Sequence, residues 1–222
     1  LGGLALAAGR RLQARFSAAA SREAVRLPQP ARPAPPLSSK VDLGVPGIAR
    51  FTTRNADFYR IDRNLTVPQI AAEDWTLKVH GLVDHPFELT YDDVLGMDLV
   101  EERITMTCVS NEIGGGLVGN ARWLGVPIAE LLQRAGPHRR ADQIVGRAFD
   151  GFTAGWPRKV LEDGRPALLA VGMNGVPLPL AHGFPARIVV PGLYGYVSAT
   201  KWVTEIELTT FADFDAYWVK RD

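Results

Sequence analysis

The sequence predicts an α+β fold with mixed, largely antiparallel sheets and short helices. Short runs rich in β-branched and aromatic residues recur from residue 50 to about residue 214, as strands do. Most segments between these runs are too short to hold the helix that joins two parallel strands. One run contains Asn174-Gly175, a dipeptide typical of a two-residue hairpin turn. Residues 50–222 are therefore expected to form one domain without internal repeats.

The first half of this domain is expected to contain three strands and a short helix. Residues 75–83 alternate apolar and polar side chains, which is typical of a half-buried strand. Thr90 is a suitable helix N-cap, and Asp92 and Asp93 favour the first helical turn. A helix is therefore expected within 87–97, after a short strand. The expected strands are 75–83, the beginning of 87–97 and 101–110.

The second half is expected to contain one longer helix and further strands. Within 121–136, Pro127 lies near the expected helix start and Gly136 at its end. Apolar residues at 128, 131 and 132 have the spacing of one helix face. Strands are expected at 143–152, 167–179, 184–192 and 200–210.

Residues 1–49 are expected to form a membrane-proximal stub and a proline-rich tether. The first eight residues are small or apolar, and arginines follow at positions 10, 11 and 15. Eight residues are too few to cross a bilayer, so the run is the stub of a longer transmembrane helix, a signal-peptide remnant or a short amphipathic helix. Residues 24–39 contain five prolines and predict an extended, semi-rigid tether.

The composition excludes several classes of function. The formal charge is +1 and the hydrophobic content is 46%, as in an ordinary globular protein. Basic residues after the first fifty positions are scattered and balanced by acids, so no nucleic-acid partner is expected. The single cysteine excludes an intrachain disulfide and a zinc site built from several thiolates.

That cysteine, Cys108, is expected at the end of a strand. The polar residues Ser110, Asn111 and Glu112 follow it, and four glycines occur within 114–119. A glycine-rich backbone can approach a ligand closely. The thiol is therefore a small buried apolar group, a soft metal ligand or a nucleophile, and the residue types alone leave all three alternatives open.

Residues 180–202 contain three potential cations, His182, Arg187 and Lys201, separated by glycines. Glycine-rich turns combined with basic side chains favour an anion site suited to a phosphate. Each residue also has a structural alternative. His182 can cap a turn, Arg187 can lie on a solvated strand face, and Lys201 can extend along the surface to water.

Two segments strongly resemble the sulfite oxidase family of molybdopterin-dependent oxidoreductases: TCVSNEIGGGLVGNARWLGVPIAELL and GMNGVPLPLAHGFPARIVVPGLYGYVSATKWVTEIEL. The bacterial branch of that family includes the catalytic subunit of the periplasmic methionine-sulfoxide reductase. The resemblance extends from about Asn55 to Thr210. It implies a sulfite-oxidase-type molybdopterin-binding fold for residues 50–222, and one molybdopterin with molybdenum as the cofactors.

The resemblance also implies roles for individual residues. Cys108 would be the metal ligand, and Arg60 would face the metal as a second catalytic residue. Asn120 and Arg122 would line the mouth of the pocket. The implied cofactor-binding residues are Asn55, Asn111, His182, Arg187, Ser198, Thr200 and Lys201.

One part of the sequence departs from the sulfite-oxidising members. Those members carry a pocket tyrosine that helps to bind an oxyanion, whereas this chain has Phe152, Thr153 and Trp156 in the corresponding region. Sulfite is therefore not the expected substrate, and the bacterial reductase type is the better match.

The resemblance implies a molybdenum-dependent enzyme that performs two-electron oxygen-atom transfer on a small S- or N-oxide or oxyanion. Electrons would be exchanged with an external carrier, for instance a membrane haem or quinone component. We expect a monomeric domain tethered to the membrane on its extracytoplasmic face. The alternatives are a non-redox module that binds an anion or other ligand, and a cysteine-nucleophile hydrolase with His80 or His85 as its base.

Overall fold

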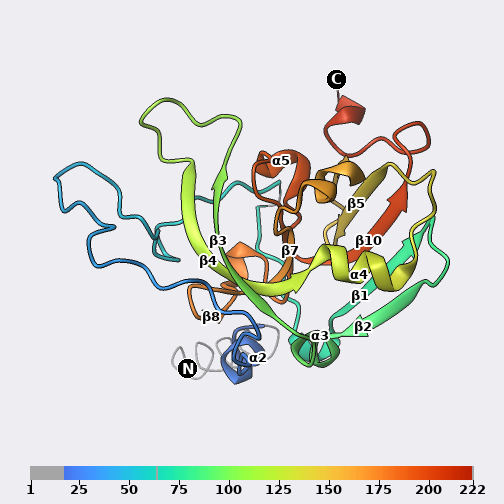
Figure 1. The fold of residues 1–222 in the computed structure, drawn as a ribbon, viewed down its shortest axis with the longest axis horizontal. Coiled ribbons are helices and arrows are strands. Elements are labelled where there is room, and N and C mark those ends of the chain that lie inside the picture. Colours follow the sequence, from blue (N-terminus) through green and yellow to red (C-terminus); the bar gives the residue numbers. More distant parts are fainter. Residues whose placement is uncertain (1–17, 64, 222) are drawn as a thin grey trace, which may run out of the picture.

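The computed structural model describes residues 18–63 and 65–221, which form an α+β fold of two sheets and short helices (Figure 1). In the first sheet, β1 and β10 are parallel and all other neighbours are antiparallel. In spatial order this sheet contains β2 (Phe87–Thr90), β1 (Thr76–Gly81), β10 (Val203–Thr209), β5 (Gln143–Ala148) and β6 (Thr153–Pro157).

The second sheet is antiparallel throughout. In spatial order it contains β3 (Val100–Thr107), β4 (Val118–Pro127), β7 (Leu168–Met173) and β8 (Val176–Pro177), and β9 (Arg187–Val189) also pairs with β7. Asn174 and Gly175 join β7 to β8, and their φ angles of 53° and 83° suit a primed hairpin turn. The expected hairpin and the mixed, largely antiparallel arrangement are both confirmed.

The helices are short. Thr90 and Asp93 form the capping box of α3, in which each side chain bonds the backbone N–H of the other residue. Gly136 follows the last residue of α4, and its φ of 68° is the left-handed conformation that glycine adopts at helix ends. Both ends match the sequence signals. The α-helices are α2 (Ala19–Ala24), α3 (Tyr91–Leu95), α4 (Ile128–Ala135) and α5 (Gly195–Ser198), and the 3₁₀ segments are η1 (Ala72–Asp74), η2 (Arg158–Asp163), η3 (Leu180–His182) and η4 (Val219–Arg221).

The longest strand, β4, was not expected from the sequence. The pattern over 121–136 predicts only a helix near Pro127, and the structure places ten residues of strand before it. β4 lies between β3 and β7, so the second half of the strand is buried on both faces. A strand of this kind does not alternate apolar and polar residues, so the period-two signal is missing.

The segment 143–152 also differs from the single strand expected there. β5 ends at Ala148, the chain turns at Gly151 with a φ of 79°, and β6 returns alongside β5. The turn matters for function because it brings residues 149–152 to the edge of the cavity described below. α5 was likewise not predicted.

One continuous core contains buried side chains from both sheets. α4 contacts β4 of the second sheet and β1 of the first, and so spans the two. The largest fully buried side chains include Trp75, Trp123 and Trp156. Burial of such rings is the main source of stability for a domain of this size.

Residues 18–36 lie against the second sheet rather than apart from it. Arg22 donates hydrogen bonds to the carbonyls of Leu178 and Pro177, and Ala31 donates to Leu99. The proline-rich segment, expected to be a tether, is hydrogen-bonded to the edge beside β3. The expected membrane stub lies in residues 1–17, outside the described residues, and no described helix is long and apolar enough to cross a bilayer.

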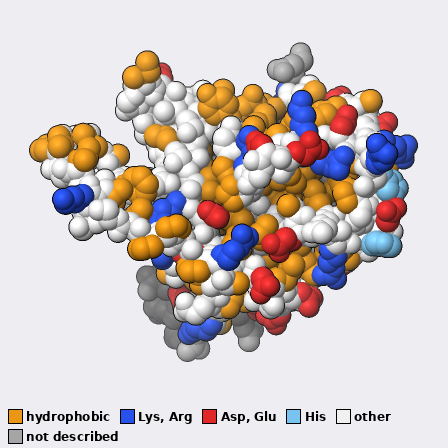
Figure 2. Space-filling view, in the orientation of Figure 1, with side chains coloured by type: hydrophobic (Ala, Val, Ile, Leu, Met, Phe, Trp, Pro, Cys, Tyr) orange, Lys and Arg blue, Asp and Glu red, His pale blue; other side chains and the backbone are white. Residues whose placement is uncertain are grey.

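Two loops, one within residues 37–50 and the other within 108–117, project from the side of the second sheet (Figure 1). Their bases are joined because Asn120 donates to the carbonyl of Phe51 and accepts from Thr53 through its own carbonyl. Apolar side chains gather near both tips (Figure 2), among them Leu43 and Ile113, which are 69% and 107% exposed.

Candidate active site

A cavity of about 270 Å³ opens where the two sheets meet. It is lined by residues that follow β3, by residues of β9, and by the end of β5 with the turn after it. Four of the residues singled out in the sequence as chemically active line it: Cys108, His182, Arg187 and Lys201. Segments more than ninety residues apart are thus brought to one site.

Cys108 is the first residue after β3, and its backbone is held on both sides. Its N–H donates to the carbonyl of Leu117 at 2.9 Å, and its carbonyl accepts from Asn111 at 3.0 Å. These two bonds close the base of the glycine-rich loop. The Cys108 side chain is half-buried and lines the cavity. Of the three alternatives for this thiol, a fully buried core residue does not fit, and a ligand or a reacting group does.

Arg187 is a buried cation without a buried anion. It is 5% exposed and forms no ion pair within the described part of the chain. Nη1 donates to the carbonyl of His182 at 3.1 Å, its guanidinium lies 5.1 Å from the ring centre of Trp123, and Nε has no partner. Burial lowers the pKa of Arg187 to about 10. Such a charge is costly to bury unless an anion joins it, so the site is built for an anionic group from outside the chain.

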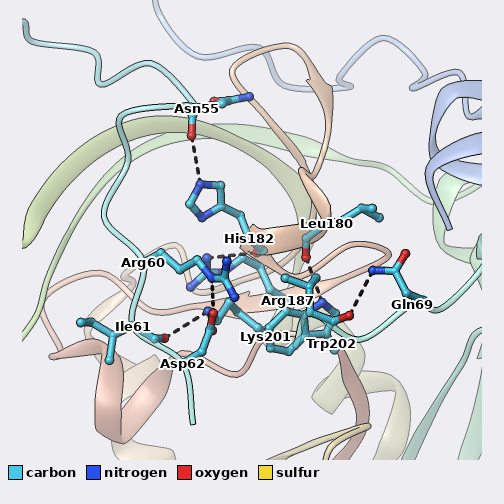
Figure 3. Close-up of polar contacts among 11 residues, drawn as sticks. Asn55, Arg60, Ile61, Asp62, Gln69, Leu180, His182, Arg187, Lys201 and Trp202 are labelled. Atoms are coloured by element: carbon cyan, nitrogen blue, oxygen red, sulfur yellow. Dashed lines mark hydrogen bonds and ion pairs between the residues drawn. The ribbon is translucent and has the colours of Figure 1, made fainter. Parts of the chain in front are cut away.

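His182 shares this wall of the cavity (Figure 3). Its Nε2 donates to the backbone carbonyl of Asn55 at 3.0 Å, and its ring meets Phe58 edge-on at 5.6 Å. Burial lowers the pKa of His182, and the Arg187 charge lowers it further. The ring is therefore neutral near pH 7, with the proton on Nε2 and Nδ1 available as an acceptor.

A glycine allows His182 and Lys201 to lie close together. Gly183 has a φ of 106°, and a Cβ there would lie 3.1 Å from both Arg187 Cβ and Lys201 Cα. A larger residue would push η3 away from β9. The cationic cluster therefore depends on this position having no side chain.

Lys201 and Arg60 share one carboxylate, that of Asp62 (Figure 3). The Asp62 side chain is 6% exposed, and Lys201 also donates to the carbonyl of Ile61 at 3.1 Å. Asp62 lines the cavity, whereas Arg60 does not and is partly exposed beside it. Arg60 and Lys201, which were predicted separately, thus share an acidic partner that sequence reasoning missed.

Asn55 and Asn111 hold the backbone around the cavity instead of lining it. The Asn55 amide donates to Met173 at 3.2 Å and accepts from Asn174 at 2.7 Å. The Asn111 side chain accepts from Leu117 at 2.7 Å. Both side chains are committed to these bonds, so their predicted contacts with a cofactor stay predictions.

Ser198 and Thr200 are fully buried and bond backbone carbonyls. Ser198 donates to Tyr194 at 3.0 Å, and Thr200 donates weakly to Gly146 at 3.5 Å. Neither hydroxyl lines the cavity. Ser198 and Thr200 position α5 and β9 through these bonds. That they donate to a cofactor stays a prediction.

Tyr59 was not singled out in the sequence. Tyr59 lines the cavity and stacks on Phe58 with ring centres 5.3 Å apart. Burial raises the pKa of Tyr59, Arg187 lowers it and Cys108 raises it, so the hydroxyl lies within the influence of both groups. An aromatic residue next to Phe58 has the pattern of a core residue, so the sequence did not predict that Tyr59 lines the cavity.

Neither histidine considered as a base for Cys108 reaches the cavity. His80 on β1 pairs with Glu205 at 2.7 Å, and His85 lies in the exposed turn after β1. Neither is among the residues that line the cavity. Asn120 and Arg122, expected at the pocket mouth, lie on β4, where Asn120 binds the 51–53 segment and Arg122 pairs with Glu101.

Comparison with known proteins agrees with the site. Residues 64–218 match the family described as "Oxidoreductase molybdopterin binding domain". The uncharacterized oxidoreductase YuiH of Bacillus subtilis is 37% identical over 137 residues, which are 61% of this chain and 65% of YuiH. Mouse mitochondrial sulfite oxidase is 29% identical over 197 residues, 78% of this chain and 35% of the relative.

Two further comparisons extend this similarity. The tobacco protein "Nitrate reductase [NADH] 2" is 28% identical over 183 residues, 70% of this chain and 20% of the relative. The sulfane dehydrogenase SoxCD of Paracoccus pantotrophus has the same fold, with a TM-score of 0.66, 23% identity, and coverage of 72% of this chain and 44% of that one. The chain thus spans about two thirds or less of the length of these relatives.

The residues of the cavity fit a molybdopterin cofactor with molybdenum. Cys108 offers one soft thiolate to a metal whose other ligands come from the pterin, and Arg187, His182 and Lys201 offer cationic or donor groups. The unpartnered Nε of Arg187 is the donor that a bound phosphate would satisfy. Sequence profile, fold and cavity agree that the chain belongs to the molybdopterin-binding oxidoreductase family, of the sulfite oxidase and nitrate reductase type.

Proposed function

We propose that the protein is an enzyme that transfers an oxygen atom to or from a small S- or N-oxide or oxyanion and exchanges two electrons with an external one-electron carrier. The observation that carries this proposal is the placement of Cys108 and the buried, unpaired Arg187 in one cavity. For a sulfoxide the balanced reaction is R₂SO + 2e⁻ + 2H⁺ → R₂S + H₂O. The bound molybdenum cofactor would supply this two-electron chemistry.

The chain's own residues have three tasks in this proposal. Cys108 fixes the metal through its thiolate at a backbone position that two hydrogen bonds determine. Arg187 binds the cofactor phosphate, with Lys201 oriented by Asp62 beside it. His182 offers neutral Nδ1 as an acceptor for a pterin N–H.

Other residues support these groups through the backbone that they hold. Asn55 holds the 53–60 segment, and with it Phe58 and Tyr59, against β7. Asn111 shapes the loop after Cys108. Arg60, beside Asp62, adds positive potential near the cavity and thus favours an electron-rich oxide.

The test is Cys108→Ser in the cofactor-loaded enzyme. A hydroxyl is a poor ligand for a soft metal, so we expect molybdenum per chain to fall at least tenfold and sulfoxide reduction to vanish. The measurements are elemental analysis, pterin fluorescence after acid release, and turnover with a reduced dye as electron donor. Ser110→Ala, two residues along and outside the cavity, is the matched control. Full activity and full molybdenum in Cys108→Ser would refute the ligand role.

The same measurements separate the two alternatives. A non-redox binding module would retain the pterin or another anion without turnover in any redox assay. A cysteine hydrolase would lose activity on alkylation without containing molybdenum. The absence of His80 and His85 from the lining of the cavity disfavours it.

We further propose that the domain is tethered to the extracytoplasmic face of a membrane. The apolar start of the sequence supports a tether. The outer face is supported by the resemblance to the periplasmic methionine-sulfoxide reductase subunit, whereas Arg10, Arg11 and Arg15 after the apolar run favour the cytoplasmic side. A membrane haem or quinone component would then be the electron carrier. Fractionation of the host cell tests this proposal. Recovery of the protein in the cytoplasmic fraction after lysis, without pelleting with membranes, would contradict it.

A further inference from the structure

The outer part of the cavity is lined by aromatic rings from three separate segments. Phe152 comes from the turn before β6, Tyr196 from α5, and Tyr217 and Trp218 from the segment that follows β10. The inner part contains Cys108, His182 and Arg187, as described above. One cavity therefore has a cationic end and an aromatic end.

Tyr217 is fixed in this wall by its backbone and by its ring. Its N–H donates to Thr153 Oγ1 at 2.9 Å, which ties the C-terminal segment to the start of β6. Its ring contacts Phe152 at 5.4 Å between centres, and the guanidinium carbons of Arg63 and Arg221 lie 5.3 and 3.7 Å from its centre. The ring is therefore well anchored and its position is set by the fold.

Trp218 differs from its neighbour because much of its ring is open. It is 47% exposed and meets Tyr217 and Tyr196 edge-on, with ring centres 5.2 and 6.4 Å apart. The edge contacts hold its orientation and leave ring surface free towards the cavity that it lines. An indole held in this way is a stacking platform for a flat apolar group.

Charged groups of both signs lie at the aromatic end. Asp150 lines the cavity, and its Oδ1 accepts from the N–H of Phe152 at 3.0 Å. Arg63 lines it as well, and its guanidinium carbon lies 5.3 Å from the ring centre of Tyr217. Aromatic surface, and not a net charge, therefore distinguishes this wall.

We propose, on the basis of the function proposed above, that Phe152, Tyr196, Tyr217 and Trp218 select the substrate. The class they select is an organic sulfoxide or N-oxide that carries an aryl or similarly flat apolar substituent. The oxide oxygen points to the cationic end near Cys108, and the apolar substituent lies on Trp218. The reaction proposed at this site is the two-electron reduction balanced above.

The test compares two sulfoxides that differ in this substituent, methyl p-tolyl sulfoxide and dimethyl sulfoxide. Calorimetry on the cofactor-loaded enzyme gives Kd, and a reduced-dye assay gives KM and kcat. In Trp218→Ala we expect Kd and KM for the tolyl compound to rise roughly 3- to 10-fold, with kcat and the dimethyl sulfoxide values unchanged, because one stacking contact is lost. Trp218→Phe should restore most of the difference.

The matched control is Phe211→Ala, an exposed aromatic residue of the same segment that lines a different hollow beside Arg158. It should leave both sulfoxides unaffected. Equal losses for both sulfoxides in Trp218→Ala, or equal effects of Phe211→Ala, would overturn the proposal. Tolyl-selective binding without turnover would support the substrate wall and count against the proposed reaction, so the two failures are distinguishable.

Discussion

The two ends of the cavity are stabilised in opposite ways. At the cationic end, Arg187 is buried with an unpartnered Nε and a pKa lowered to about 10. At the aromatic end, Tyr217 and its neighbours satisfy one another through ring contacts and hydrogen bonds. The first end is incomplete without a ligand, whereas the second is complete by itself. This difference supports the proposal that the cationic end binds the resident cofactor and the aromatic end a transient substrate.

The largest effect that would sharpen this comparison is expected from Arg187→Met. Without the guanidinium, cofactor loading should fall at least tenfold, measured as the pterin-to-protein ratio. The cofactor-free protein should instead become more stable by about 1–3 kcal/mol, because an unpaired buried charge is replaced by an apolar side chain of similar length. Urea unfolding measures the second effect.

Arg54→Met makes the same charge change at an exposed position of the segment leading to the cavity and serves as the control. It should change neither loading nor stability appreciably. Normal loading of Arg187→Met would break the comparison, because the cationic end would then not depend on this charge.

A smaller effect is expected from Asp62→Asn. Its carboxylate is nearly buried and pairs with both Lys201 and Arg60. Loss of this shared anion should lower the free energy of unfolding of the cofactor-free protein by about 2 kcal/mol. Asp57→Asn, which breaks an exposed pair with Arg54 in the same segment, should cost less than about 0.5 kcal/mol. Equal costs would show that the Asp62 pair is no more than a surface contact.

The smallest effect concerns pH. The pKa of His182 in the folded protein lies below the ordinary value of 6.5, so the unfolded chain binds a proton more readily. This contribution to stability is fully present above pH 6.5 and is lost as the pH falls below that value. His182→Gln, whose amide can still donate to Asn55, should flatten the fall in the free energy of unfolding between pH 6.5 and 5. An unchanged slope would contradict the neutral assignment.

The sequence predicted the cationic end well because its residues are chemically unusual where they stand. A single thiol after a strand, and three potential cations among glycines, are informative before any fold is known. Cys108, His182, Arg187 and Lys201 do meet in one cavity. The residue types alone, without the fold, therefore indicate this end of the cavity.

The family resemblance placed Phe152 in the pocket region, but most of the aromatic end could not be predicted, because rings such as Tyr217 and Trp218 are indistinguishable in sequence from core residues. Only the turn at Gly151 and the segment after β10 bring them to the cavity. The hydrogen bonds of Asn55 were equally hidden: its side chain, predicted to contact the cofactor, bonds β7 and the hairpin after it in the structure. Such hydrogen-bond partners depend on tertiary contacts. So does the burial of β4 on both faces, which removed the alternating pattern that would have predicted this strand.

The hairpin at Asn174 imposes two independent demands on one residue. Its φ of 53° admits few residue types, chiefly glycine, asparagine and aspartate. Its side chain accepts from the N–H of Arg122 and donates to Thr53 and Asn55. Glycine meets the first demand and has no side chain for the second, while aspartate lacks the N–H to give. Asparagine alone closes the turn and fastens the neighbouring wall, so a dipeptide that marks local geometry also keeps distant segments in register.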